Sequence, residues 1–380
     1  MEDLKQIMPK KLGFGCMRLP VANGNSEEID DAVFCRMIDR YMEQGFVYFD
    51  TAYPYHNQKS EEAVRRCLVE RYDRERFLLA DKMPVWLVQN MEDYSEIFER
   101  QLARCGVTYF DFYLFHAMNK TRVEETEKTG GFAFVQRMKT EGRIRHIGFS
   151  FHDTAEALEE ILKNHPEMEF VQLQINYYDW ESENVQSRKC YEVAEKHGVP
   201  VIVMEPVKGG TLANMVGEPA RILSALDENA SYASYAVRYA ASLPNVILVL
   251  SGMSDLKQLQ DNTAYMKDFQ PLTDKEQQAI GKVVEELEKL PTIPCTNCRY
   301  CVEGCPKKIR IPDIFGVYNM GVQFGVTDVT RGSYRCQIDG SGKAGDCIKC
   351  GKCEAQCPQH LEIRKLLEEA ADIYEKEMHL

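Results

Sequence analysis

Phe170-Val-Gln-Leu-Gln-Ile-Asn-Tyr177 and Val199-Pro-Val-Ile-Val-Met-Glu205 are two short apolar runs in this 380-residue chain. A helical pattern over Asn184–Lys196 separates them, and Gly198 stands where that helix should end. Parallel strands that are buried on both faces have such near-continuous apolar runs. The stretch therefore predicts one strand–helix–strand unit of a parallel sheet.

The same alternation recurs from residue 11 to about residue 265. The predicted strands are Leu12–Met17, Val47–Ala52, Phe77–Met83, Phe110–His116, Ile144–Ser150, Phe170–Tyr177, Val199–Glu205 and Val246–Ser251. Helical patterns follow them at Ser60–Arg71, Tyr94–Arg104, Phe132–Thr140, Thr154–Asn164, Asn184–Lys196, Ala230–Ser242 and Asp255–Met266, with Ser26–Gln44 after the first strand. Strand–helix units in this number predict an α/β fold of the (β/α)8 TIM-barrel type. An open doubly wound sheet is the alternative, but Gly13-Phe14-Gly15 is not followed by its glycine-rich fingerprint.

A cysteine motif occurs twice near the C-terminus. Cys295-Thr-Asn-Cys298-Arg-Tyr-Cys301-Val-Glu-Gly-Cys305-Pro306 and Cys347-Ile-Lys-Cys350-Gly-Lys-Cys353-Glu-Ala-Gln-Cys357-Pro358 share the spacing C-x2-C-x2-C-x3-C-P. This spacing matches the bacterial ferredoxin run, in which the fourth cysteine of each copy binds the other cluster. We therefore expect two 4Fe–4S clusters. Their ligands would be Cys295, Cys298, Cys301 and Cys357 for the first, and Cys347, Cys350, Cys353 and Cys305 for the second.

Two zinc sites or a disulfide framework are the other interpretations of these thiols. Structural zinc more often uses two separated pairs of ligands than three closely spaced cysteines. The start of the chain has no signal-peptide pattern, which favours a reducing compartment and a cytoplasmic protein. Cys336 lies between the two motifs, and no role is assigned to it.

Length and composition support two domains. A chain of 380 residues exceeds the size at which one core usually stops growing. A helical stretch over Pro271–Leu290 leads to Pro291-Thr-Ile-Pro294, which breaks the helix. We predict a barrel over residues 1–285 and a small helical or irregular ferredoxin-like domain over residues 286–380. The net charge of −13 argues against a nucleic-acid or anionic-membrane partner, and no apolar run is long enough to span a membrane.

Polar side chains stand at the ends of three successive predicted strands. Asp50 and Tyr55 follow the second strand, Lys82 ends the third and His116 ends the fourth. Catalytic groups of a TIM barrel lie at this edge. A lysine beside a tyrosine would lower the tyrosine pKa, and a histidine alongside can orient a carbonyl oxygen. Singly, each residue is as compatible with a cap or a core position as with catalysis; together they favour an active site.

These residues resemble the aldo/keto reductase family. The run Asp50-Thr-Ala-Tyr-Pro-Tyr55, then Lys82 and His116, follows the family's order, and Gly142–Ser150, Val171-Gln172 and Val249–Asn262 resemble its fifth, sixth and eighth strands. The resemblance implies Tyr55 as general acid, Lys82 as the group that lowers its pKa, Asp50 as the partner of Lys82, and His116 as an aid in placing the carbonyl. It also implies a nucleotide-binding set. Ser150 and Gln172 would bind a nicotinamide carboxamide, and Ser251, Gly252, Gln258 and Asn262 would face the nucleotide end.

The sequence departs from the family pattern at three places. Phe151 stands where the family usually has Asn, and Met204 where it has a stacking Tyr. Asp255 lies where many members have basic residues for the 2′-phosphate of NADP, so NADH is favoured over NADPH. A phosphate group would still be served by the backbone of Gly209, Gly210, Ser251 and Gly252 and by the helix start at Asp255.

Three functions remain open from the sequence. In the first, the barrel reduces an aldehyde or ketone to an alcohol, or the reverse, with NAD(P)H, and the clusters transfer electrons or support the structure. In the second, a barrel-bound flavin such as FMN exchanges electrons with the clusters and with ferredoxin or another carrier, because a flavin handles both hydrides and single electrons. The third is a non-catalytic electron-transfer or redox-sensing protein.

Overall fold

The computed structural model describes residues 4–22, 28–183, 185–295, 299–357 and 359–376. The chain divides into two compact units. The first comprises residues 1–208 and 233–277, and the second comprises residues 209–232 and 278–380. The segment 209–232 belongs to the second unit although it lies within the sequence predicted as barrel. The predicted boundary at residue 285 stays a prediction.

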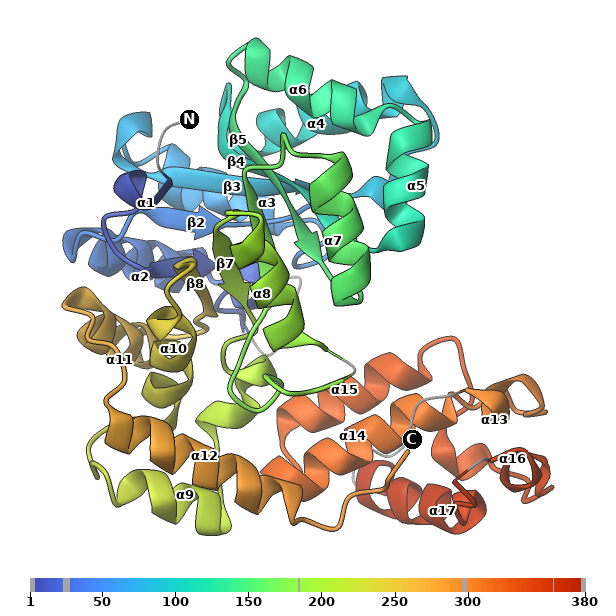
Figure 1. Ribbon diagram of the computed structural model, residues 1–380. Helices are drawn as coiled ribbons and strands as arrows, with labels where there is room; N and C mark the ends of the chain where they lie inside the picture. Colours follow the sequence, from blue (N-terminus) through green and yellow to red (C-terminus); the bar gives the residue numbers. More distant parts are fainter. Residues whose placement is uncertain (1–3, 23–27, 184, 296–298, 358, 377–380) are drawn as a thin grey trace. The chain divides into compact units, whose positions relative to one another are not determined.

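The first unit contains a closed parallel barrel, which confirms the predicted fold class. In its described residues the strands follow one another around the barrel in chain order, and the last pairs with the first (Figure 1). The strands are β1 (Leu12–Gly15), β2 (Tyr48–Asp50), β3 (Leu78–Met83), β4 (Phe110–Met118), β5 (Ile144–Phe151), β6 (Phe170–Gln174), β7 (Val201–Met204) and β8 (Val246–Gly252). The predicted sixth strand ends three residues early because the Asn176 side chain accepts hydrogen bonds from the backbone N–H groups of Tyr178 and Asp179 and turns the chain.

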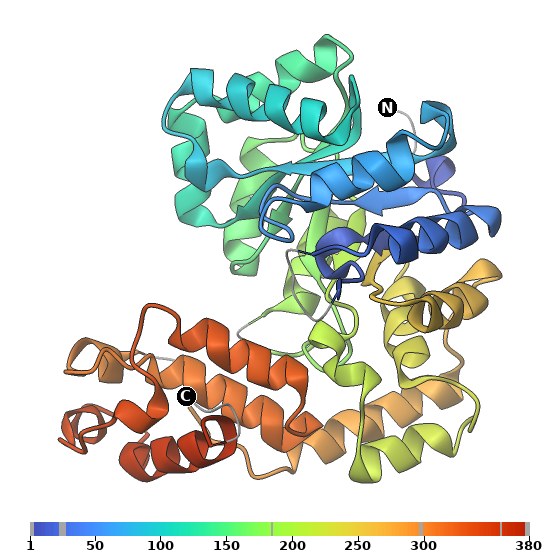
Figure 2. The same cartoon turned by 180° about the vertical axis from the view of Figure 1, so that it is seen from behind.

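Helices follow the strands and lie outside them, as views from the front and from behind show (Figures 1 and 2). They are α2 (Asp31–Glu43), α3 (Ser60–Val64), α4 (Met91–Cys105), α5 (Lys120–Lys128), α6 (Gly131–Thr140), α7 (Ala155–Asn164), α8 (Ser187–Lys196), α10 (Tyr232–Ser242) and α11 (Leu256–Lys267), and α12 (Asp274–Glu288) follows. Side-chain caps set several starts. Asn90 accepts hydrogen bonds from the first turn of α4, and Asp255 accepts one from Gln258 N of α11 at 2.8 Å. Helix α3 continues as a π-helical turn over Arg65–Val69.

The interior of the barrel is apolar toward the amino ends of the strands and polar toward their carboxyl ends. Tyr48, Phe112 and Phe170 pack their rings together, with centroids 5.1 and 5.3 Å apart. The short helix α1 (Leu4–Ile7) adds Leu4 to this cluster, as does Met8 behind it. The packed interior leaves the carboxyl ends of the strands as the place for a site. No helix among the described residues is both long and apolar enough to cross a membrane.

The second unit is helical around its own core. Its helices are α9 (Gly217–Ser224), α13 (Tyr300–Glu303), α14 (Ile311–Phe324), α15 (Asp328–Ile338), α16 (Lys352–Ala355) and α17 (Ile363–Tyr374). The rings of Tyr334 and Tyr374 stack with centroids 5.0 Å apart. The Tyr374 hydroxyl donates a 3.0 Å hydrogen bond to Val317 O of α14. These contacts join α14, α15 and α17, the frame that carries the cysteine loops.

Candidate active site and cluster cavities

Asp50 and Lys82 form a buried ion pair at the carboxyl ends of β2 and β3. Lys82 Nζ lies 2.5 Å from Asp50 Oδ1, and both side chains are almost fully buried. Lys82 Nζ also donates to Thr51 O at 2.8 Å. Burial acts to lower the pKa of Lys82, but the Asp50 carboxylate outweighs it, and the Lys82 pKa ends above its ordinary value. Lys82 is therefore charged, and its ammonium group is fixed at the carboxyl ends of the strands.

Tyr55 completes a triad with this pair. Lys82 Nζ lies 3.3 Å from Tyr55 Oη and 4.9 Å from the centroid of its ring. Burial raises the pKa of Tyr55 above its ordinary value of 10.0, and Lys82 only partly opposes that rise. This direction differs from the sequence expectation, because the chain pattern shows the neighbouring cation but not the depth of the hydroxyl. Tyr55 is therefore protonated at neutral pH and able to donate its proton.

His116 stands beside Tyr55 at the end of β4. The two ring centroids are 6.0 Å apart and nearly perpendicular. Burial lowers the pKa of His116 well below 6.5, and the positive charges of Lys82 and Arg122 add to the effect. Its Nδ1 is buried and has no hydrogen-bond partner among the described residues. A neutral imidazole with an unsatisfied nitrogen is suited to hydrogen bonding with a small ligand.

The two residues expected to bind a carboxamide already have protein partners. Gln172 Nε2 donates to Asp50 Oδ2 at 3.1 Å. Ser150 Oγ accepts from Ala117 N at 2.7 Å, and Ala117 has a left-handed backbone with φ of 55°. Ser150 and Gln172 are register partners on β5 and β6, so both face the same part of the barrel mouth. The carboxamide role stays a prediction.

The residues predicted for the nucleotide end gather where β8 meets α11. Asn262 Nδ2 donates to Ser251 Oγ at 2.7 Å, and Gln258 Oε1 accepts from Ser254 N at 2.8 Å. Gly252 lies beside Gly15 of β1, where both backbones are close. Gly209 and Gly210 have φ of 67° and 102° in the 3-10 segment Lys208–Ala213, and both belong to the second unit.

Two departures from the family pattern have clear positions. Phe151 is 3% exposed and belongs to the main core of the first unit, with its ring 6.2 Å from Phe149. Met204 ends β7 and is partly buried. Neither side chain supplies the amide or the aromatic ring that the family usually has there.

A cavity of about 490 Å³ opens at the strand ends, and Tyr55 and His116 line it. Trp86 and Arg122 line it. From the sequence, Trp86 is a candidate for the wall of an apolar pocket and Arg122 a candidate for contact with an anionic substrate, but neither is distinguished there from a packing or surface residue. Arg122 lies in the first turn of α5, a helix the sequence analysis did not predict. Asn119 caps this helix by accepting a 2.9 Å hydrogen bond from Arg122 N. An asparagine at this position is the sequence feature from which the start of α5 could have been predicted.

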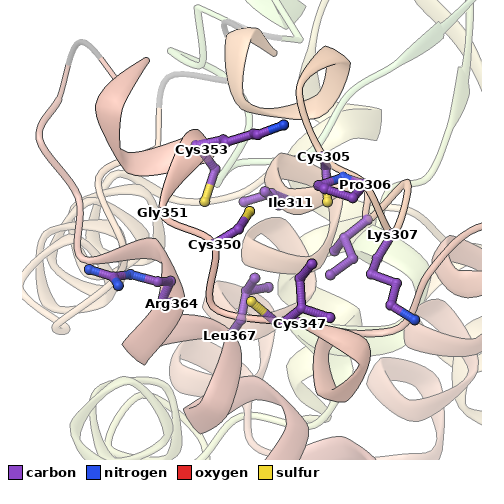
Figure 3. Close-up of a pocket in the computed structure, with 13 residues that line it drawn as sticks. Cys305, Pro306, Lys307, Ile311, Cys347, Cys350, Gly351, Cys353, Arg364 and Leu367 are labelled. Carbon is purple, nitrogen blue, oxygen red and sulfur yellow. The ribbon is translucent and has the colours of Figure 1, made fainter.

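Four predicted cluster ligands line one cavity of the second unit. Figure 3 shows Cys305, Cys347, Cys350 and Cys353 with their sulfur atoms facing a common space. The first of these comes from the N-terminal motif and the other three from the C-terminal motif. Ile311 and Leu367 supply apolar walls. This is the set predicted for the second cluster.

Cys295, Cys301 and Cys357 line a second cavity. Cys298, the fourth predicted ligand there, lies outside the described residues. Ile311 lines both cavities, so its side chain stands between the two sets of thiols. The exchange of Cys305 and Cys357 between the motifs is the arrangement of two-cluster ferredoxins.

A cluster and a zinc ion need their thiolates at different distances from one another. Within the part of the chain that the structure describes, no three His, Cys, Asp or Glu side chains are placed to hold one metal ion. Zinc needs its thiolates about 2.3 Å from a single atom. A 4Fe–4S cluster takes its four thiolates on four different irons, which leaves them further apart.

Comparison with known proteins agrees with both parts. The model of the aldo/keto reductase family matches residues 11–285, and that of a 4Fe-4S dicluster domain matches residues 294–362. An uncharacterized oxidoreductase of Schizosaccharomyces pombe is 26% identical over 267 residues, which are 67% of this chain and 81% of that protein. The 9,11-endoperoxide prostaglandin H2 reductase of Trypanosoma cruzi is 25% identical over 250 residues, 64% of this chain and 80% of that protein.

Solved structures share the barrel. An aldo-keto reductase from Bacillus halodurans in its holo form superposes with a TM-score of 0.57 at 25% identity, over 72% of this chain and 91% of that one. An aldo-keto reductase from Klebsiella pneumoniae in complex with NADPH has a TM-score of 0.57 at 19% identity, over 72% and 90% of the two chains, and shows the fold alone. The chain is thus an oxidoreductase with a 4Fe–4S domain after its barrel. It belongs to the aldo/keto reductase family.

Proposed function

We propose that the barrel reduces an aldehyde or ketone to an alcohol, with NADH as the hydride donor and Tyr55 as the general acid. The observation that carries the proposal is the Asp50–Lys82–Tyr55 arrangement, in which Lys82 Nζ lies 2.5 Å from the carboxylate and 3.3 Å from the hydroxyl. The aldo-keto reductase from Klebsiella pneumoniae, which shares this fold, was solved in complex with NADPH, and this supports a nicotinamide as the hydride donor. When bound, the nicotinamide supplies a hydride to the carbonyl carbon.

The residues of the chain supply the proton and hold its charge. Tyr55 Oη donates a proton to the carbonyl oxygen, and the Lys82 ammonium stabilises the tyrosinate that remains. Asp50 keeps Lys82 charged and in place. His116, neutral because of burial and nearby cations, hydrogen-bonds the carbonyl oxygen through a ring N–H. The carbonyl gains a hydride and a proton, and the nicotinamide loses two electrons.

The strand-8 end fits the other end of the nucleotide. Ser251, Gly252 and the capped start of α11 offer hydroxyl and backbone N–H groups to a phosphate. Asp255 is the N-cap there, at the sequence position where many family members have basic residues for a 2′-phosphate. This favours NADH over NADPH.

We propose two 4Fe–4S clusters in the second unit that exchange electrons with a ferredoxin or another carrier. Four thiols line one cavity and three described thiols line the other. Cys350 is exposed, so an external protein can approach the second cluster closely. The apolar side chains around the thiols exclude water, and exposure and hydrogen bonding to sulfur set a cluster's potential.

Replacement of Tyr55 tests the catalytic assignment. Tyr55→Phe should lower kcat for carbonyl reduction about 100-fold to 10,000-fold, the usual range for a positioned acid, and leave iron and sulfide unchanged. Tyr72→Phe is the matched control, because its hydroxyl bonds to Asp39 on α2 outside the barrel mouth. Unchanged turnover in Tyr55→Phe removes Tyr55 as the acid.

A flavin-linked reaction is the second candidate. It is favoured by the core position of Phe151 and by Met204, since neither helps to hold a nicotinamide ring. In this version FMN in the barrel would exchange electrons with the clusters. The visible spectrum of the cofactor that acid releases from anaerobically purified protein distinguishes a flavin from a nicotinamide. An oxidised flavin absorbs visible light and a nicotinamide does not.

A further inference from the structure

The cavity above the catalytic groups has a distinct charge and shape. Tyr55 and His116 lie on one side, and Met17, Trp86 and Arg122 contribute to its walls. Met17 is 53% exposed and Trp86 is 41% exposed, although both are large and apolar. Large apolar side chains exposed around a cavity indicate that a ligand covers them.

Arg122 is held in a fixed position in this cavity. Its Nη1 donates to Ala117 O at 2.6 Å, and its guanidinium carbon lies 5.1 Å from the Trp86 ring centroid. The backbone N–H of Arg122 bonds to the Asn119 cap of α5. A guanidinium fixed by a carbonyl and a ring loses little freedom when it binds a planar acceptor.

The charge of Arg122 has no carboxylate partner in the described part of the chain. Within those residues it makes no ion pair, and its field instead helps to lower the pKa of His116 and of His152. One of its five N–H donors bonds to Ala117 O. A cation with remaining donors, beside an exposed aromatic ring, is a site for an anion.

We propose that Arg122 binds a carboxylate of the substrate, which is therefore an aldehyde or ketone with an apolar body and a remote carboxylate. The inference rests on the proposed carbonyl reduction and names its substrate class. Ring centroids lie 6.0 Å apart from Tyr55 to His116 and 5.2 Å apart from His116 to Trp86. Arg122 in turn lies 5.1 Å from the Trp86 ring, so the His116 and Trp86 rings lie between Tyr55 and Arg122 in this series of contacts, and an apolar spacer in the substrate would connect its carbonyl to its carboxylate.

The number of charges favours a carboxylate over a phosphate ester. Among the described residues that line this cavity, Arg122 is the one arginine, and no lysine lines it. One guanidinium balances one negative charge, in the paired geometry that arginine makes with carboxylates. A phosphate monoester carries about −1.5 to −2 at neutral pH and would leave charge uncompensated.

Matched substrates test the inference on the full holoprotein. 4-Formylbenzoate and its methyl ester share the aldehyde and the ring but differ by one charge. In wild-type protein kcat/KM should favour the acid. Arg122→Gln should lower the acid-to-ester ratio of kcat/KM about tenfold to hundredfold, and Arg122→Glu should reverse the preference. Arg122→Lys keeps the positive charge but lacks the planar guanidinium that can donate two parallel hydrogen bonds to a carboxylate. Its acid-to-ester ratio of kcat/KM should be intermediate.

Lys120→Gln is the control, because it removes the same charge from an exposed side chain two residues earlier on α5. Its acid-to-ester ratio should equal that of the wild type. If Arg122→Gln leaves the acid-to-ester ratio of kcat/KM unchanged, even with a fall in kcat/KM on both substrates, the carboxylate assignment is overturned.

A binding measurement separates this inference from the proposed reaction. The dissociation constant of 4-formylbenzoate, measured by calorimetry in the Tyr55→Phe background, should rise at least tenfold when Arg122→Gln is added. That rise supports the carboxylate site even if Tyr55→Phe retains turnover, a result that would overturn only the role of Tyr55. No change in the dissociation constant would overturn the site.

Discussion

Gln172 donates a 3.1 Å hydrogen bond to Asp50 Oδ2, while Lys82 binds the other oxygen of the same carboxylate at 2.5 Å. The bond joins β6 to β2, two strands that are not neighbours in the barrel. Asp50 is therefore fixed from two directions, and through it Lys82 is held beside Tyr55. Gln172, which the sequence predicts to bind the cofactor, thus also helps to hold Asp50 and Lys82 beside the Tyr55 hydroxyl.

Loss of the Asp50 charge should destabilise the barrel. Asp50→Asn leaves the buried Lys82 ammonium without its carboxylate, a change that costs about 3–5 kcal/mol in other buried pairs. We expect a fall of this size in the free energy of unfolding, measured anaerobically by urea denaturation. Adding Lys82→Met should recover most of the stability, since it removes the unpaired buried charge. It should not recover activity. Equal stability of Asp50→Asn and wild type would contradict the ion pair.

The pH dependence of reduction should follow the raised pKa of Tyr55. The acid works while protonated, so activity persists below its pKa and falls as the pH rises through it. Because burial places this pKa above the ordinary 10.0, kcat/KM for reduction should stay level through pH 9 to about 10 and fall only beyond. Alcohol oxidation needs the tyrosinate and should rise over the same high range. Profiles recorded with one substrate pair in both directions check this; a fall in reduction near pH 7 would contradict it.

The crossed ligand pattern predicts which cluster each cysteine serves. Cys305 lines the cavity of Cys347, Cys350 and Cys353, so Cys305→Ala should remove the second cluster. Iron should drop from about eight to about four atoms per chain. Electron paramagnetic resonance of the reduced protein should then show one cluster without magnetic coupling. Cys336→Ala, at an exposed thiol between the motifs, should keep all the iron and is the control.

The choice between nicotinamides should depend on Asp255. Wild-type protein should prefer NADH to NADPH in kcat/KM if the carboxylate of Asp255, the N-cap of α11, lies near the ribose 2′ position, as the proposed function requires. Asp255→Asn removes the charge but keeps a good helix cap. The ratio of kcat/KM with NADH to kcat/KM with NADPH should therefore fall, while the free energy of unfolding stays the same. A wild-type preference for NADPH would show that Asp255 serves only as the cap.

Much of the site was predictable from local pattern. Asp50, Lys82 and His116 end buried parallel strands, and the closed barrel brings strand ends together whatever the loops do. The thiols were predictable for a similar reason, because their spacing fits a short loop around one cluster. Cys298, however, lies outside the described residues, and its predicted role stays a prediction.

Other features depended on tertiary structure. Arg122 reaches the cavity only because Asn119 starts a helix after β4, and Trp86 only because its 3-10 turn follows β3. The raised pKa of Tyr55 results from burial, which no sequence pattern reports. Gly209 and Gly210 were predicted to serve a barrel-bound phosphate, but they belong to the second unit, so that role stays a prediction.

The path of the hydride tests the central claim most directly. Anaerobic holoprotein would be given NADH that carries deuterium at the transferred position of C4, together with 4-formylbenzoate, and the product alcohol analysed by mass spectrometry. If the nicotinamide in the barrel delivers its hydride directly, the alcohol carbon should carry close to one deuterium per molecule. If electrons instead pass singly through the clusters to a flavin, the hydrogen equilibrates with water and the alcohol should carry almost none, which would contradict the account.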